Sequence, residues 1–172
     1  INMWSKKNEE LLNEQINKEL YASYCYKNLY CYFSNREIGY LNIANYFKKC
    51  SIEEQEHADN MIKYQLERGG SIVFRDINAS YFNNNSNKSD LYTAFYYVLE
   101  LEKDVYNSLL RLISLSDQNI EFVDYITNSF LKEQLEDINK LNIIINKLNK
   151  IDNNQLGLIY FDDTFEEKKF II

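Results

Sequence analysis

The stretch FKKCSIEEQEHADNMIKY, residues 47–64, decides the fold. Its apolar residues recur at steps of three and four, which is typical of a helix with one buried face. In the middle of that face, Glu54 and His57 interrupt the apolar row as a Glu-x-x-His unit. This spacing places both side chains on one side of a helix. Arg68-Gly69-Gly70 follows, and glycine is preferred just past a helix end, so we predict a helix over about 40–68.

The composition favours an all-α protein. The 172 residues include no proline and four glycines, the two residues that mark most turns between strands. The length fits one domain, and 45% hydrophobic with 26% charged residues suits a globular chain. We predict one domain over 1–172, with a bundle over about 5–150. Its long helices are expected at about 5–34, 40–68, 90–115 and 118–150, with a short tail helix at about 158–168.

The connections carry further predictions. Ser89 or Asp90 can cap the third helix, and Asp117 the fourth. The polar stretch 71–88 is predicted to be a surface loop. A loop of this length can run along a whole bundle, which would set helices two and three parallel to each other.

Charge and cysteine usage exclude several classes of partner. The net charge of −7 and the pI near 4.8 exclude nucleic acid, which needs a basic face, and favour cations. No apolar stretch is long enough to cross a membrane. The first residues do not show the basic and then apolar pattern that is typical of a signal peptide. Three cysteines without a CxxC pair indicate reduced thiols, so we predict a cytoplasmic protein; a removed secretory or organellar leader stays an open alternative.

The other long helices repeat the interruption at mid-length. Glu19 and Glu102 stand in the apolar rows of the first and third helices. The row of the fourth helix is Thr127, Phe130, Gln134, Ile138, Leu141, Ile145 and Leu148, which Gln134 interrupts. A buried carboxylate needs a counter-charge, and these rows contain no Lys or Arg.

Divalent cations would supply the missing counter-charge. Glu53, one position off its row, can turn inward and raises the count to four negative charges, enough for two divalent ions. Carboxylates with one imidazole suit Fe or Mn better than a structural zinc. A single inward Glu, or one Glu-x-x-His unit, is more often a mis-phased or solvated side chain. Four coincident interruptions instead predict a metal site.

Together these motifs resemble a known family. The matching segments are Asn17-Lys18-Glu19-Leu20-Tyr21-Ala22-Ser23-Tyr24, Glu53-Glu54-Gln55-Glu56-His57-Ala58, Arg68-Gly69-Gly70, Leu101-Glu102-Lys103 and Glu133-Gln134. In order and spacing, from about residue 9 to 165, the chain resembles eukaryotic ferritin of the catalytic heavy-chain type. The resemblance implies a ferritin-like four-helix bundle with a long crossover between helices two and three and a short fifth C-terminal helix. It also implies a homo-oligomeric cage of about two dozen subunits (a 24-mer) that stores ferric mineral.

The resemblance also implies roles for single residues. Glu19 and His57 would bind the tighter iron, Glu54 would bridge two irons, and Glu102 would hold the second. Gln134 would sit beside the second iron and orient water or O₂. Such a ferroxidase centre would oxidise Fe²⁺ with O₂.

Residues around the centre have implied roles with plainer alternatives. Glu53 matches a mobile carboxylate that passes iron to the cavity, and Tyr26 a hydrogen-bond partner or transient electron donor, or else aromatic core. Glu56 and Asp59 match cavity-facing residues that nucleate mineral, or else a solvated helix face. Asp124 matches a residue of the three-fold pore.

The chain departs from the family pattern in the pore region and in the tail, and it has one histidine where the usual symmetric di-iron bundle has two Glu-x-x-His units. Thr127 stands where the pore has a glutamate, and the tail ends differently, which leaves iron access and the four-fold pore open. The single histidine makes the second metal site poorer, which suits a metal that passes through. Two alternatives stay open: a cage that stores iron without useful oxidation, and a metal-free helical bundle that acts as a structural or interaction module.

Overall fold

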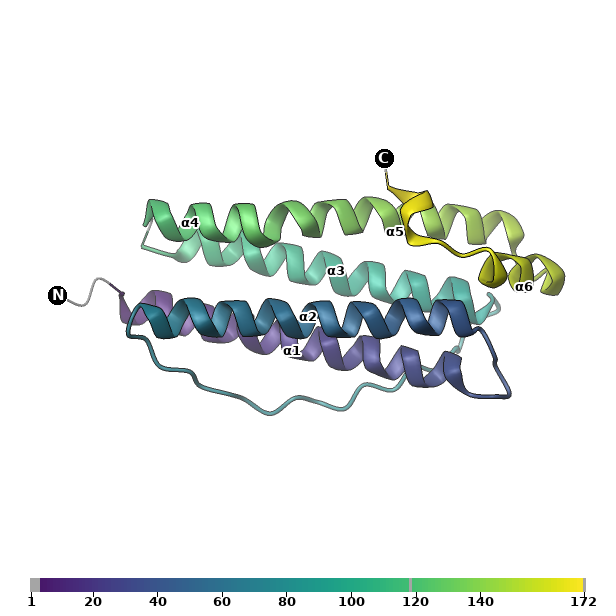
Figure 1. The fold of residues 1–172 in the computed structure, drawn as a ribbon, viewed down its shortest axis with the longest axis horizontal. Helices are drawn as coiled ribbons and strands as arrows, with labels where there is room; N and C mark the ends of the chain where they lie inside the picture. The colour runs from purple at the N-terminus through teal and green to yellow at the C-terminus, as the bar shows by residue number, and fades with distance from the viewer. Residues whose placement is uncertain (1–3, 118, 172) are drawn as a thin grey trace.

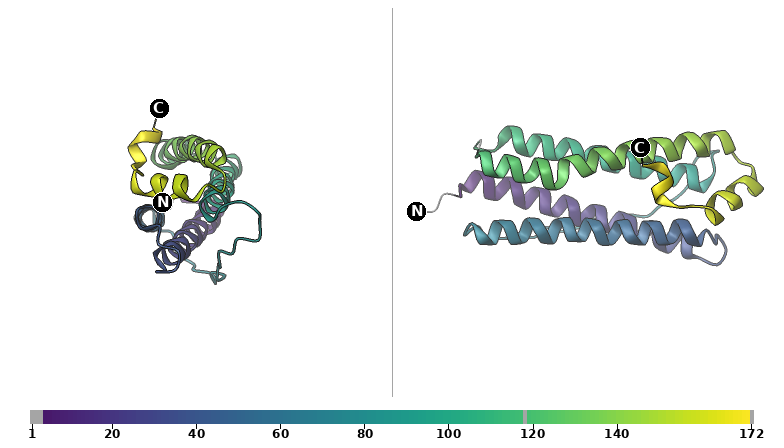
Figure 2. Two further views of the ribbon diagram at one scale, coloured as in Figure 1. Left: turned by 90° about the vertical axis from the view of Figure 1, so that its right-hand side faces the viewer. Right: turned by 45° about the horizontal axis from the view of Figure 1, so that its top comes forward.

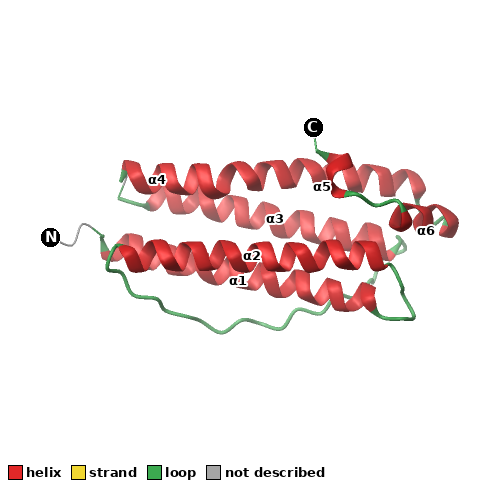
Figure 3. Cartoon of the chain, in the orientation of Figure 1, coloured by secondary structure: helices red, strands yellow, loops and turns green. Residues whose placement is uncertain are grey.

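The computed structural model describes residues 4–117 and 119–171, and within these residues it contains helices and no strand (Figure 3). The elements are α1 (Lys6–Ser34), α2 (Leu41–Glu67), α3 (Asp90–Leu115), α4 (Ile120–Ile126), η1 (Thr127–Leu131), α5 (Lys132–Ile151), α6 (Gln155–Asp163) and η2 (Glu167–Phe170). Because α4, η1 and α5 form one continuous rod, the long helices make a four-helix bundle (Figure 1). The predicted all-α, ferritin-like bundle is confirmed. No helix in the described ranges is both long and apolar enough to cross a membrane.

The crossover between α2 and α3 sets the topology. The chain leaves α2 through Gly69, whose positive φ of 76° favours glycine, and then runs along the length of the bundle (Figure 1). Helix α3 therefore starts at the same end as α2 and runs parallel to it, as the length of the loop predicted. Ser89 caps α3 by accepting a hydrogen bond from Tyr92 N, which confirms one of the two predicted caps.

The crossover is held by asparagines of α1. Asn13 donates its side-chain amide to Ser71 O and accepts from Val73 N, both at 3.0 Å. Asn17 donates to Val73 O at 3.2 Å and accepts from Arg75 N at 3.0 Å. Each asparagine thus replaces the partners that a neighbouring strand would supply, which satisfies the backbone of a segment without secondary structure.

The fourth rod corrects two sequence predictions. Its N-cap is Asn119, which accepts from Phe122 N, and not Asp117; the predicted first residue, 118, lies outside the described residues. In η1 the backbone bonds run from i to i+5, so each turn there holds more residues than an α-turn. The inward face therefore changes phase across η1: Ile126 is buried, whereas the predicted Thr127 is only half-buried. Within α5, Ile144 is buried and the predicted Ile145 is half-buried. Ile138 is half-buried too.

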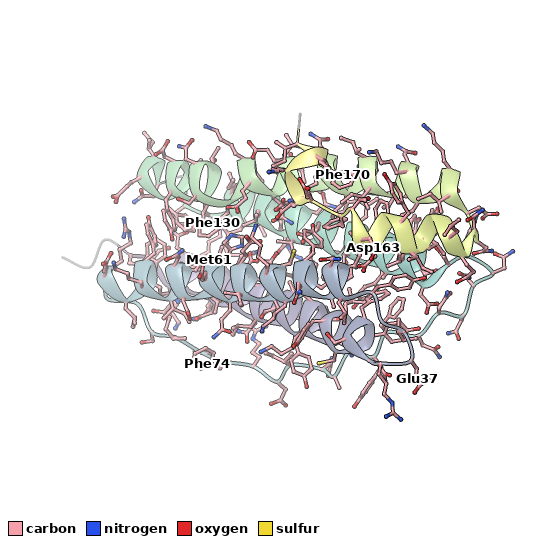
Figure 4. All side chains as sticks on the ribbon, turned by 45° about the vertical axis from the view of Figure 1, so that its right-hand side comes forward. Glu37, Met61, Phe74, Phe130, Asp163 and Phe170 are labelled. Carbon is pink, nitrogen blue, oxygen red and sulfur yellow. The ribbon has the colours of Figure 1, made fainter. Side chains whose placement is uncertain are left out.

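The core is rich in aromatic rings. Phe47 lies 5.2 Å from Phe95 and 5.7 Å from Phe33 between ring centroids, and all three are fully buried. Met61 of α2 and Phe130 of η1, both labelled in Figure 4, are also buried. Aromatic contact supplies much of the apolar area that holds a chain with few alanines together.

The C-terminal region differs from the predicted helix at 158–168. Helix α6 begins at Gln155, because Asn154 caps it by accepting from Gly157 N at 2.8 Å, and it ends at Asp163. A separate turn, η2, then folds back beside α5, on the side of the bundle away from the crossover (Figure 2). Asp162 accepts a hydrogen bond from Ile43 N at 2.8 Å, so α6 caps the start of α2, whose own N-cap, Tyr40, makes no such bond.

Candidate metal centre

One half of the site is made by α1 and α2. Glu19, Glu54 and His57 each offer a ligand atom, and these atoms lie within 4.8 Å of one another. The two glutamates are buried, with 1% and 5% of their surface exposed. Glu54 and His57 are three residues apart on one helix, and His57 Nδ1 lies 3.3 Å from Glu54 Oε2. The Glu-x-x-His unit therefore faces Glu19 across the gap between two antiparallel helices.

This half gathers negative charge that is poorly satisfied. Burial raises the pKa of Glu19 well above its usual value, and the charge of Glu54 raises it further. Gln15 Nε2 donates to Glu19 Oε1 at 2.7 Å, whereas the buried Oε2 of Glu19 accepts no hydrogen bond from any described residue. An orphaned carboxylate oxygen next to a second carboxylate and an imidazole fits a cation, because hard oxygen ligands and imidazole suit Fe²⁺.

His57 sits between carboxylates on both sides. Its Nε2 lies 3.4 Å from Glu133 Oε2, and its Nδ1 faces Glu54. Burial acts to lower the pKa of His57, but the hydrogen bonds with Glu133 and Glu54 outweigh it and raise this pKa to about 11. The surroundings of the ring thus stabilise positive charge, and a divalent ion placed there would meet the same field and displace the proton.

The other half is made by α3 and α5. Glu102 is buried, and Tyr26 donates its hydroxyl to one carboxylate oxygen. Gln134 donates Nε2 to the other carboxylate oxygen, and also to the backbone oxygen of Glu102 at 3.0 Å. Burial raises the pKa of Glu102, the two donors lower it again, and the result is about 7. Glu102 does not belong to the tight group of Glu19, Glu54 and His57.

The structure places the predicted carboxylates at different depths. Glu53 is half-buried, does not join the tight group, and pairs with Lys49 at 3.3 Å. Glu56 is exposed and lines, with Glu53, His57 and Glu133, a cavity of about 540 Å³ on the α2–α5 side. Asp59 is exposed too, and is not among the residues that line this cavity.

Asp124 lies away from the centre. It is exposed on α4 and accepts a hydrogen bond from Asn128 Nδ2 at 2.6 Å. Nothing in the geometry of one subunit joins it to the other site residues, so its role in a pore stays a prediction.

Two residues near the site were missed by the sequence rows. Glu133 stands off the apolar row, directly before the buried Gln134, and it approaches His57 from α5. Lys140 is also off the row, yet it is buried with 7% exposure and pairs with Asp137 at 2.6 Å. The predicted rows contained no positive charge, and the buried Lys140 supplies one. Its ammonium group faces Asp137 and not the tight group.

Known proteins match the chain over most of its length. The family described as Ferritin-like domain matches residues 9–151. The ferritin middle subunit of Aquarana catesbeiana is 34% identical over 158 residues, which cover 90% of this chain and 88% of that protein. The soma ferritin of Lymnaea stagnalis is 37% identical over 153 residues, which cover 88% and 86%.

Plant proteins match equally well over part of their length. A chloroplastic ferritin of Malus baccata var. xiaojinensis is 37% identical over 157 residues, which cover 90% of this chain and 62% of that longer protein. Animal and plant relatives thus share the helices that carry the candidate centre. The chain belongs to the ferritin family, and its similarity is to the eukaryotic ferritins.

Proposed function

We propose that this ferritin stores iron and is a ferroxidase, with a dinuclear centre inside each subunit. Iron is its substrate and cargo: Fe²⁺ is oxidised by O₂, and the ferric product is deposited as mineral. The observation that carries the proposal is the buried convergence of Glu19, Glu54 and His57 around a Glu19 oxygen that accepts no hydrogen bond from the part of the chain that the structure describes. Without a bound cation, the carboxylates of Glu19 and Glu54 would be buried against each other, which would lower the stability of the fold.

The ligand set supports the chemistry. In this proposal Glu19 and His57 bind one Fe²⁺, Glu54 lies between the two irons, and Glu102 binds the second beside Gln134. Oxygen ligands favour Fe³⁺ over Fe²⁺, which drives oxidation. Each Fe²⁺ gives one electron to the same O₂, which takes up two protons from water and leaves as hydrogen peroxide.

The two halves of the site would differ in affinity. Glu102 already accepts hydrogen bonds from Tyr26 and Gln134, and a metal would have to compete with both donors. The second iron is therefore held more weakly, which suits a product that must move on. Tyr26 acts through its hydrogen bond to Glu102 in this scheme.

The α2–α5 side of the bundle supports a route for the product. The cavity of about 540 Å³ connects the surroundings of His57 with the carboxylates of Glu53, Glu56 and Glu133. We infer that ferric iron leaves there, that Glu56 and Asp59 help to nucleate mineral, and that this face lines the interior of a 24-subunit cage. The cytoplasm stays our prediction for the location.

Iron loading of the purified protein in air tests this proposal. Wild type should elute as a large assembly and oxidise two Fe²⁺ per subunit much faster than buffer does. Glu102→Leu should keep the assembly and lose the fast oxidation, because only the second metal position is removed. A large assembly without fast oxidation would leave a passive storage cage. Unchanged metal content in Glu102→Leu, with equal or higher stability, would favour the metal-free bundle.

A further inference from the structure

The C-terminal segment, residues 164–171, folds back over the bundle next to the candidate centre. Phe165 stacks against Phe170 with 5.5 Å between ring centroids and contacts Tyr46 of α2 at 5.2 Å. Phe170 is 5% exposed. These apolar contacts seat the segment across α2 and α5 (Figures 2 and 4).

Glu167 fixes this segment to both helices by ion pairs. Its Oε1 lies 2.6 Å from Lys140 Nζ of α5, and its Oε2 lies 2.8 Å from Lys49 Nζ of α2. One carboxylate thus joins two lysines from the two helices that flank the cavity. The bridge depends on the path that the chain takes after α6, because Glu167 is the fourth residue after the end of that helix.

Each of these lysines also contacts a second carboxylate close to the centre. Lys49 Nζ lies 3.3 Å from Glu53 Oε1, and Lys140 Nζ lies 2.6 Å from Asp137 Oδ1. Glu53 and Glu167 therefore share one ammonium group. Because the negative charge of Glu167 partly neutralises the ammonium group of Lys49, Lys49 attracts Glu53 less strongly than it would alone.

Glu53 occupies the position where this sharing matters. It directly precedes Glu54, and it lines the same cavity as His57 and Glu133. A carboxylate in that wall is among the first that an ion meets on its way out of the tight group. Its side chain is still 38% exposed, so it has room to turn towards His57 or towards Lys49.

We propose that Glu167 is a positioning residue for iron transfer: by sharing Lys49, it sets how firmly Glu53 is held away from the metal centre. This inference rests on the proposed function for the direction of iron movement. The tail then acts on the reaction without touching the metal, through one lysine that faces two carboxylates.

The proposal predicts opposite effects for two substitutions. In Glu167→Gln, Lys49 attracts Glu53 alone, so Glu53 turns inward less often and the centre empties more slowly. In Lys49→Met the alkyl stem stays while the charge is lost, so Glu53 is released and the centre empties faster. The expected change is roughly two- to five-fold in each direction, the range that partly exposed ion pairs give. The double variant should behave like Lys49→Met.

Two successive doses of Fe²⁺ in air separate this proposal from the proposed function. The first dose reports oxidation at an empty centre and should be equally fast in all variants. The recovery of fast oxidation on a second dose, after a varied delay, reports transfer out of the centre. Glu166→Gln is the matched control, because among the described residues Glu166 pairs with Lys168 and Lys169 of the tail and with no other basic group, and it should leave recovery unchanged.

The position of Glu53 gives a readout that mere loosening of the tail would not produce. In crystals of each variant soaked with Co²⁺, Glu53 should lie on Lys49 in Glu167→Gln and face the metal in Lys49→Met. Slowed recovery in both variants, or an unchanged position of Glu53, would overturn the proposal. If wild type lacks a fast first dose, the ferroxidase proposal fails, and the position of Glu53 in these crystals alone then decides whether Glu167 controls it.

Discussion

Glu19 and Glu102 are both buried glutamates at mid-bundle, yet their surroundings differ. Glu19 faces Glu54 and His57 and keeps one oxygen without a donor among the described residues. Glu102 accepts hydrogen bonds from Tyr26 and Gln134, both neutral donors. The first carboxylate is arranged for a cation that comes from outside, whereas the second is partly satisfied by the protein. The difference teaches that one bundle core can hold two buried glutamates with unequal need of a counter-charge, which is the basis for the tight and the loose metal position that we propose.

Among the carboxylate and tyrosine variants, removal of the glutamate that we propose to lie between the two irons should have the largest effect. Glu54→Gln removes one carboxylate from the tight group. It also removes the electrostatic repulsion between Glu54 and Glu102. We expect the initial rate of Fe²⁺ oxidation to fall at least roughly 100-fold, which corresponds to about 3 kcal/mol. Stopped-flow absorbance measures it, with Glu136→Gln on the exposed face of α5 as the control. A loss of less than about tenfold would mean that Glu54 does not serve both metals.

Metal stoichiometry should separate the halves. In anaerobic titration with Co²⁺, Glu102→Gln should lose the weaker ion and keep the tight one, since Glu19, Glu54 and His57 stay in place. Glu19→Gln should lose the tight ion, with an affinity that drops by roughly 10- to 100-fold. Equal losses in the two variants would contradict the distinction between a tight and a loose position.

The pH dependence of stability should show the cost of burying Glu102. Its pKa in the folded protein is about 7, against an ordinary value of 4.5, chiefly because of burial. At pH values below 4.5 both folded and unfolded chains are protonated there, so the residue costs little. Between pH 4.5 and 7 the unfolded chain loses this proton first, and the free energy of unfolding decreases until it levels off above pH 7.

Comparison with Glu102→Gln isolates this contribution. With a chelator present, urea unfolding should show the variant gaining stability over wild type as the pH rises from 5 to 8. The gain should approach about 3 kcal/mol at the upper end. A difference that does not change with pH would show that the pKa of Glu102 is the same in the folded and the unfolded protein.

Tyr26→Phe should have the smallest effect. It removes the hydroxyl that donates to Glu102 and leaves the aromatic contact with Phe47 in place. We expect a loss of about 1–2 kcal/mol in the free energy of unfolding, since a buried acceptor loses its donor. Oxidation should slow only a few-fold in stopped-flow measurements. A loss as large as that of Glu54→Gln would instead assign Tyr26 a direct part in electron transfer.

Most of the bundle could be predicted from the sequence, because helix periodicity, missing prolines and the Gly69 stop all act locally. The Glu-x-x-His unit was readable for the same reason, since two residues three positions apart on one helix share a face. The phase change after η1 could not be read in this way. It depends on a π turn that no single residue signals, and it puts Ile126 in the core where Thr127 was predicted.

The tail shows the other limit of sequence reasoning. A helix at 158–168 fits the apolar spacing, yet α6 ends at Asp163 and the segment turns back over α5. The decisive partners of that segment, Lys49 and Lys140, lie far away in the chain. Ion pairs between residues this far apart in the sequence are set by tertiary packing, so a local sequence pattern does not predict them.

The most direct test of the account is a stopped-flow comparison of wild type with His57→Ala. Two Fe²⁺ per subunit are added to the purified protein in air, and ferric absorbance is followed. The account predicts fast oxidation in wild type and none above buffer in His57→Ala, because the tight position loses its only nitrogen ligand. Equal rates in the two proteins would contradict the assignment of Glu19, Glu54 and His57 as the tight iron site.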